Sequence, residues 1–221
     1  EQRLEKSRHG QLEFKTTMEY IHRLVPEDAK ILEVGAGTGR YSVTLAKEGY
    51  EVTAIELLEN NLEVLKGKAQ GLDHVQAFQG DALDLSRWED ETFDLTLVLG
   101  PMYHLYEKEQ VHKAIDEAIR VTKKDGVIFF AFLSVYAILF KNYLKENLQD
   151  GIEENFTDTY EIRHFEEQLF TGYDIVEFEE LFAGKDIEYM STVATDTILE
   201  LARKRTDFVM SDEDFEAFAK Y

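Results

Sequence analysis

The chain has 221 residues, of which 44% are hydrophobic, so it can form one sizeable core and does not need two domains. Forty-five acidic residues against 24 Lys and Arg give a formal charge of −21, which would repel a phosphate backbone and excludes nucleic acid as an expected partner. The absence of cysteine excludes disulfides, thiolate metal sites and cysteine nucleophiles, and no apolar run approaches the roughly 18 residues of a membrane helix. We therefore expect a soluble, cytoplasmic protein that does not act at a membrane.

Strand-like and helix-like segments alternate through the first part of the sequence. Residues 11–25 have apolar side chains at helical spacing before Pro26, which predicts a lead-in helix. We then expect strands at 30–34, 51–56, 75–78, 93–99 and 126–133, with helices at 40–48, 60–68 and 108–122. This order predicts an α/β fold, a doubly wound Rossmann-like and mostly parallel sheet with helices on both faces.

The regular alternation of strands and helices ends after the fifth expected strand. A helix is predicted at 134–150 and a polar connection at 151–164, so 134–172 is interpreted as an insertion that acts as a lid at the carboxyl edge of the sheet. Alternating Thr and Ser with Met190 and Val193 predict a sixth strand at 187–195. Helices are expected at 173–183, 197–205 and 212–221, the last opened by the capping box Ser211-Asp212-Glu213-Asp214.

A glycine-rich segment follows the first strand directly and indicates a ligand-binding loop. Glu33 stands at the tip of the strand, and the alternate glycines Gly35, Gly37 and Gly39 let the backbone turn sharply and approach a ligand. A Walker loop is excluded because Arg40-Tyr41 stand where Gly-Lys-Ser/Thr is needed. The dinucleotide fingerprint is weakened, since it also needs glycine at the position of Arg40, but it stays open.

A carboxylate at the end of the second strand supports the ligand-binding interpretation. Glu56 lies about 20 residues beyond the glycines, the distance expected for an acid that bonds both ribose hydroxyls. The third strand leads into Gly80-Asp81-Ala82, and the fourth ends at Leu99-Gly100-Pro101. A ribose-containing cofactor is therefore predicted at this edge of the sheet.

These four segments, in this order, resemble the class I S-adenosylmethionine-dependent methyltransferases over roughly residues 10–135. The run Met102-Tyr103-His104-Leu105 is similar to one found in many small bacterial members. The resemblance implies a single methyltransferase domain over 1–221, made of a helical cap (1–29), a cofactor-binding core (30–133), the insertion (134–172) and a C-terminal part (173–221). The cofactor residues implied are Glu33, Gly35, Ala36, Gly37, Gly39, Glu56, Leu57, Asp81, Ala82, Leu99 and Gly100.

The resemblance also sets expectations for individual roles. Asp81 would bond the adenine amine, whereas Glu33 is interpreted as bracing the glycine loop rather than touching the cofactor. The family's sheet has seven strands, and we expect six or seven here, with an antiparallel seventh strand beyond Tyr221. No metal is expected, because Leu99-Gly100 offers no acid where catechol-type enzymes bind one.

The acceptor is expected to be a small molecule methylated on oxygen, nitrogen or carbon. His104 is the candidate general base for a hydroxyl acceptor because its pKa near neutrality suits proton removal, although a structural histidine bonded to backbone is the stronger alternative. Two other functions stay open, a nicotinamide-dependent oxidoreductase and a nucleoside-binding protein without catalysis on the same fold.

Overall fold

The computed structural model describes residues 4, 6–143, 147–195, 199 and 209–220. The chain divides into two compact units, one formed by Pro26–Ile187 and the other by Glu1–Val25 with Glu188–Tyr221. Each unit is described by itself below. That the whole of 1–221 acts as a single methyltransferase domain stays a prediction.

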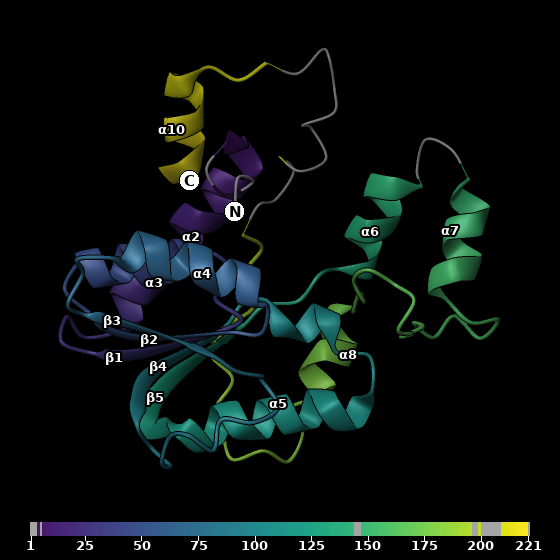
Figure 1. The fold of residues 1–221 in the computed structure, drawn as a ribbon. Coiled ribbons are helices and arrows are strands. Elements are labelled where there is room, and N and C mark those ends of the chain that lie inside the picture. Colours follow the sequence, from purple (N-terminus) through teal and green to yellow (C-terminus); the bar gives the residue numbers. More distant parts are fainter. Residues whose placement is uncertain (1–3, 5, 144–146, 196–198, 200–208, 221) are drawn as a thin grey trace. The chain divides into compact units, whose positions relative to one another are not determined.

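The larger unit is built on a parallel sheet of five strands in the order β3-β2-β1-β4-β5. The strands are β1 (Lys30–Val34), β2 (Glu51–Glu56), β3 (Val75–Gln79), β4 (Phe93–Val98) and β5 (Thr122–Phe130). Helices α3 (Arg40–Lys47) and α4 (Glu59–Ala69) cover one face of the sheet, and α5 (Lys108–Val121) covers the other (Figure 1). The predicted doubly wound α/β fold is confirmed.

The central strands β1 and β4 are buried along almost their whole length because helices cover both faces. Val34 pairs with Ile55 of β2 on one side and with Val98 of β4 on the other. The main core joins these strands to the apolar face of α5, which contributes Ile115 among others. This core fixes the carboxyl ends of β1, β2 and β4 beside one another.

Several sequence predictions about secondary structure are wrong. Residues 187–195 form no strand, and Tyr189 and Met190 are more than half exposed. Among the residues that the structure describes, no strand pairs with this segment, and its exposed side chains are not covered by a packed layer; a strand needs both for its stability. The expected helix at 134–150 is two helices, α6 (Val135–Asn142) and α7 (Leu148–Asn155), because Asn147 takes a left-handed conformation with φ 61°.

The third correction concerns β5, which begins at Thr122 rather than at residue 126 and ends at Phe130. Thr122 pairs with Phe93, and a register shift follows between Phe93 and Leu95. The strand therefore begins with a charged stretch, which a search for apolar runs does not detect. The sheet thus has five strands in the described residues. The expected helix at 197–205 lies outside them except for Leu199, and at 173–183 only α8 (Ile175–Glu180) is regular helix.

The smaller unit contains α2 (Arg8–Leu24) and α10 (Asp212–Lys220). The predicted capping box opens α10, since the Asp214 N–H donates to Ser211 Oγ at 3.0 Å and the Ser211 hydroxyl donates to the Asp214 carboxylate at 2.6 Å. Phe215 packs on Leu12 and Leu199 in a small apolar cluster. Within the part of the chain that the structure describes, no helix is long and apolar enough to cross a bilayer.

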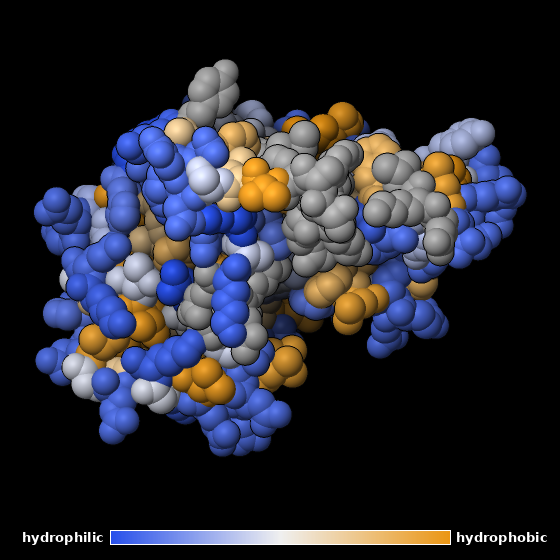
Figure 2. Space-filling model, turned by 90° about the horizontal axis from the view of Figure 1, so that it is seen from above, coloured by the Kyte–Doolittle hydropathy of each residue, from blue (hydrophilic) through white to orange (hydrophobic). Residues whose placement is uncertain are grey.

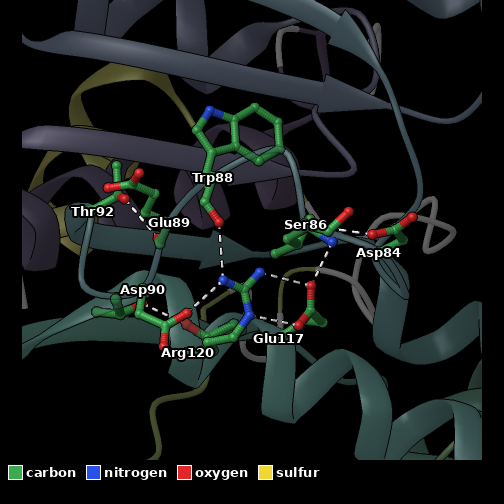
Figure 3. A network of polar contacts seen from close by, with 11 residues as sticks. Asp84, Ser86, Trp88, Glu89, Asp90, Thr92, Glu117 and Arg120 are labelled. Atoms are coloured by element: carbon green, nitrogen blue, oxygen red, sulfur yellow. Dashed lines mark hydrogen bonds and ion pairs between the residues drawn. The ribbon is translucent and has the colours of Figure 1, made fainter.

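The connection from β3 to β4 is fastened to α5 by Arg120 (Figure 3). Its guanidinium donates two hydrogen bonds to the Glu117 carboxylate, at 2.8 and 3.0 Å, and others to Asp90 and to the Trp88 carbonyl. Glu117 in turn accepts from the Leu85 N–H at 2.6 Å. The network therefore holds a long connection whose first residues lie at the carboxyl end of β3.

We expect Arg120→Met to lower the free energy of unfolding by about 1–2 kcal/mol, because Glu117, only 19% exposed, loses its bidentate partner. Urea denaturation at pH 7 measures this. The matched control Lys123→Met removes the more exposed ion pair with Asp94 and should cost less than about 1 kcal/mol. Equal costs for the two variants would contradict a special role for the Arg120 network.

Candidate active site

The order of the strands reverses between β1 and β4, and open parallel sheets bind ligands at such a point, outside the carboxyl ends of the strands. The loops that follow β1 and β4 touch there. A Cβ atom at Gly35, whose φ is +74°, would lie 2.8 Å from Pro101 Cδ, and one at Gly100 would lie 3.3 Å from the Gly35 carbonyl oxygen. Gly35 is thus needed for this close approach, and at Gly100 a side chain would be tight against the Gly35 carbonyl.

The loop after β1 is folded back onto β2. The Gly35 and Ala36 N–H groups both donate to the Ile55 carbonyl at 2.9 Å, and Gly39 is the left-handed N-cap of α3. Gly37 has a φ of +57°, and a Cβ placed on it would meet no protein atom within 4 Å. The backbone is therefore open at Gly37, where a ligand could approach without a side chain between.

Glu56 connects this loop to the start of α4. One carboxylate oxygen accepts from the Gly37 N–H at 2.7 Å, and the other accepts from the Leu58 N–H at 2.9 Å and from Asn61 Nδ2 at 3.3 Å. The side chain is 6% exposed. Because a carboxylate has about four acceptor positions, Glu56 keeps room for a hydroxyl donor in addition to these three bonds. Next to it, Leu57 and Leu58 are more than half exposed.

Glu33, the acid at the end of β1, is buried and faces the first turn of α3. It accepts hydrogen bonds from the Ser42 N–H, at 2.9 Å, and from the Ser42 hydroxyl. Burial raises the pKa of Glu33 to about 7, the two bonds from Ser42 oppose that shift, and the charge of Glu56 adds to it. The side chain thus braces the helix behind the loop.

The expected adenine residues follow β3. The Gly80 N–H donates to the Glu56 carbonyl at 3.2 Å, which places Asp81 beside the end of β2. The Asp81 carboxylate accepts from the Leu83 N–H at 2.9 Å and shapes the turn, and Ala82 packs against the core. Asp81 therefore has a defined structural role whether or not it also bonds a ligand.

Beyond β4, the chain forms the short helix η1 (Pro101–His104). The Tyr103 hydroxyl donates to the Leu99 carbonyl at 3.1 Å, so this carbonyl is already engaged. The ring centroid of His104 lies 5.1 Å from that of Tyr103 and 5.1 Å from that of Phe170. A structural histidine is expected to form a hydrogen bond to backbone. In the described part of the chain the His104 imidazole forms no such bond.

The electrostatic surroundings favour the neutral form of His104. Partial burial of the ring lowers its pKa below the ordinary value, and the negative charge of Glu56 acts in the opposite direction. His104 is therefore able to accept a proton at neutral pH, and it lies within the electrostatic reach of the carboxylate that holds the glycine loop.

The insertion returns to this edge of the sheet, as expected. The Thr171 N–H donates to the Tyr103 carbonyl at 3.0 Å, and the Tyr106 hydroxyl donates to the Gln168 carbonyl at 2.6 Å. Sequence reasoning missed Phe170 and Thr171, because 151–172 has no periodicity and these contacts span more than sixty positions. The contact of this segment with η1 brings His104 and Phe170 together.

The raised pKa of Glu33 gives a testable pH dependence. The folded state binds the proton more tightly than the unfolded state, whose pKa is near 4.5, so this stabilisation is complete below pH 4.5 and is lost as the pH rises to about 7. We expect wild type to lose up to roughly 3 kcal/mol relative to Glu33→Gln between pH 4.5 and 8. Urea denaturation of both proteins at each pH measures the difference, and parallel pH profiles would contradict it.

Comparison with known proteins shows what this region is similar to. Residues 31–126 match the methyltransferase domain family. The chain is 33% identical over 109 residues to a putative methyltransferase of Geobacillus sp. (strain WCH70), which covers 48% of this chain and 43% of that protein. It is 32% identical over 129 residues to a demethylmenaquinone methyltransferase of Staphylococcus aureus (strain JH9), over 53% of this chain and 52% of that protein. The chain spans about half the length of the curated relatives it matches.

Solved structures share the fold over more of the chain. An S-adenosylmethionine-dependent methyltransferase from Methanosarcina mazei superposes with a TM-score of 0.60 at 22% identity, over 74% of this chain and 81% of that one. The YcgJ protein of Bacillus subtilis gives 0.57 at 17% identity, over 92% and 87%. Residues 31–126 therefore match the methyltransferase domain family, and the chain shares the fold of these solved structures.

Proposed function

We propose that the chain transfers a methyl group from S-adenosylmethionine to a small-molecule acceptor. The observation that carries the proposal is the pairing of Glu56 with the Gly37 N–H beneath an open stretch of backbone. A buried carboxylate with acceptor capacity left over suits a ribose diol, and the open space where a Cβ of Gly37 would lie leaves room for the nucleoside. The family of residues 31–126 supports the same cofactor.

The residues present fit this cofactor. Glu56 would hold the ribose hydroxyls, the exposed side chain of Leu57 would cover the adenine, and Asp81 would accept from the adenine amine. Gly35, Gly100 and the Leu99 carbonyl would lie beside the sulfonium end, at the meeting point of the β1 and β4 loops. When bound, the cofactor supplies an electrophilic methyl group on a positively charged sulfur.

The chain's own contribution is alignment and removal of one proton. In the transfer, an electron pair on the acceptor atom forms the new bond to the methyl carbon, and the pair of the broken carbon–sulfur bond stays on sulfur. If the acceptor is a hydroxyl or an amine, it also loses a proton. His104 is the proposed proton acceptor, and its lowered pKa, caused by desolvation, supports this role because it favours the neutral imidazole.

The proposal extends to the class of partner. A formal charge of −21 disfavours a nucleic acid, and the face shown in Figure 2 is mostly hydrophilic with apolar side chains in small patches. We therefore favour a small molecule as the acceptor. The cytoplasmic location expected from the sequence stays a prediction.

The two alternative functions make different demands on the same site. A nicotinamide oxidoreductase needs space for a pyrophosphate over the first turn of the helix, where this chain has Arg40 in place of the third glycine of the fingerprint. A nucleoside-binding protein without catalysis would share every cofactor contact. Only turnover separates it from a methyltransferase.

Methyl transfer is tested with S-adenosylmethionine that carries a radiolabelled methyl group and a panel of metabolites. The panel includes hydroxylated rings, since one relative is named a demethylmenaquinone methyltransferase, together with amines and carboxylic acids. We expect label in one product class. Tight binding of S-adenosylmethionine without label in any product would favour the binding protein, and no binding would contradict the proposal.

We expect Glu56→Gln to weaken S-adenosylmethionine binding by about 1.5–3 kcal/mol, because charge-assisted bonds to the ribose and to the Gly37 N–H are lost together. Calorimetric titration measures it. Asn61→Ala is the matched control, since it removes only the long 3.3 Å contact to the same carboxylate and should change the affinity little. An unchanged dissociation constant in Glu56→Gln would remove this residue from the cofactor site.

We expect His104→Ala to lower kcat by about 10²- to 10⁴-fold on a hydroxyl or amine acceptor, with the dissociation constant of S-adenosylmethionine unchanged. In wild type the rate should fall only below the ordinary pKa of histidine, because desolvation holds the pKa of His104 below that value. The pH profile of kcat checks this. A variant with full kcat would return His104 to a packing role.

A further inference from the structure

Three aromatic rings meet at the carboxyl end of β4. Phe170 lies with its ring centroid 5.6 Å from that of Tyr103, at an interplanar angle of 79°, and 5.1 Å from that of His104. Phe170 is 40% exposed, and His104 is exposed as well. The exposed surface of these two rings is accessible to a ligand.

We propose that Phe170, together with Tyr103 and His104, forms the acceptor subsite and selects a flat aromatic ring without negative charge. The inference rests on the proposed function, since it names the acceptor class of that site. The first observation that supports this proposal is the location of the three rings beside the glycine loop. The helix η1 follows β4 directly, and Pro101 at its start touches Gly35 of the glycine loop.

Hydrogen bonds of the neighbouring residue Thr171 fix the position of Phe170. Thr171 is fully buried and donates its N–H to the Tyr103 carbonyl, and its hydroxyl is hydrogen-bonded to His164 Nδ1. The other nitrogen of His164 lies 2.9 Å from the Glu177 carboxylate of α8. This chain of bonds ties the residue next to Phe170 to both η1 and α8, so the ring is a preorganised wall rather than a loose side chain.

The charged residues of the two segments that meet here indicate which ligand charge the subsite favours. Residues 99–106 and 165–173 contain no Lys or Arg, and the second contains Glu166 and Glu167. Carboxylates and phosphates are recognised by cationic side chains, which these segments do not supply. The Tyr103 hydroxyl is engaged with the Leu99 carbonyl, so the aromatic wall offers mainly ring surface and one imidazole.

An exposed surface of aromatic side chains favours ligands that contain an aromatic ring. Aromatic pairs prefer offset stacked or edge-to-face geometry and interact more strongly than their buried area alone explains. A hydroxyl or amine on such a ring would come next to His104, the proposed proton acceptor. The acceptor class that follows is a hydroxylated or aminated aromatic ring that is neutral or cationic.

The test measures fragment binding to the full chain saturated with S-adenosylhomocysteine. The probes are hydroquinone, its non-aromatic analogue 1,4-cyclohexanediol and the anionic ring 4-hydroxybenzoate. We expect hydroquinone to bind at least about tenfold more tightly than either of the others, as measured by saturation-transfer NMR titration. Equal affinity for the ring and the diol, tighter binding of the anion, or no binding of hydroquinone to the saturated chain would overturn the proposal.

Two variants test whether Phe170 contributes to the binding of hydroquinone. Phe170→Leu keeps an apolar side chain without a π face and should weaken hydroquinone binding about tenfold, with the affinity for S-adenosylhomocysteine unchanged. Leu169→Ala is the control, because Leu169 is the adjacent and more exposed side chain, at 75%, and should change neither affinity. Unchanged hydroquinone binding in Phe170→Leu would overturn the proposal. Failure of S-adenosylhomocysteine to bind wild type would instead contradict the proposed function.

Discussion

The hydrogen bonds of the Glu56 carboxylate are the constraint on which the site depends. This one group holds the Gly37 N–H on one side and the Leu58 N–H at the start of α4 on the other. The glycine loop thereby stays between β1 and β2, and its contact with Pro101 fixes the loop after β4. Buried backbone N–H groups need partners, and here a single side chain supplies two of them at the edge of the sheet. Packing of the core positions the strands, but Glu56 positions the loop.

The same region holds two buried carboxylates, which would interact favourably with a cation. Glu33 accepts from Ser42 of α3 and Glu56 accepts from the Gly37 N–H, and burial, with a smaller contribution from the charge of Glu56, raises the pKa of Glu33. Burial keeps both carboxylates away from water, which makes their repulsion stronger than it would be at the surface. A sulfonium bound over the loop would interact favourably with both. The arrangement thus suits a positively charged cofactor better than a pyrophosphate.

Local patterns in the sequence predicted the parts of this site that depend on neighbours in the chain. The spacing of Gly35, Gly37 and Gly39 and the position of Glu56 at a strand end follow from backbone geometry, and the five parallel strands follow from their apolar runs. The sixth strand at 187–195 was wrong because a strand needs a partner, which alternation alone does not reveal. The contact of Thr171 with Tyr103 joins distant segments and leaves no periodic signal. Whether the predicted residues bind the cofactor stays untested.

The central claim is that the open backbone above the Glu56–Gly37 bond binds S-adenosylmethionine. Calorimetric titration of the wild-type chain with S-adenosylmethionine and, separately, with NAD⁺ tests it most directly. We expect one saturable site for S-adenosylmethionine, in the micromolar range or tighter, at about −8 kcal/mol, and no saturable binding of NAD⁺. Saturable binding of NAD⁺ with none for S-adenosylmethionine would contradict it.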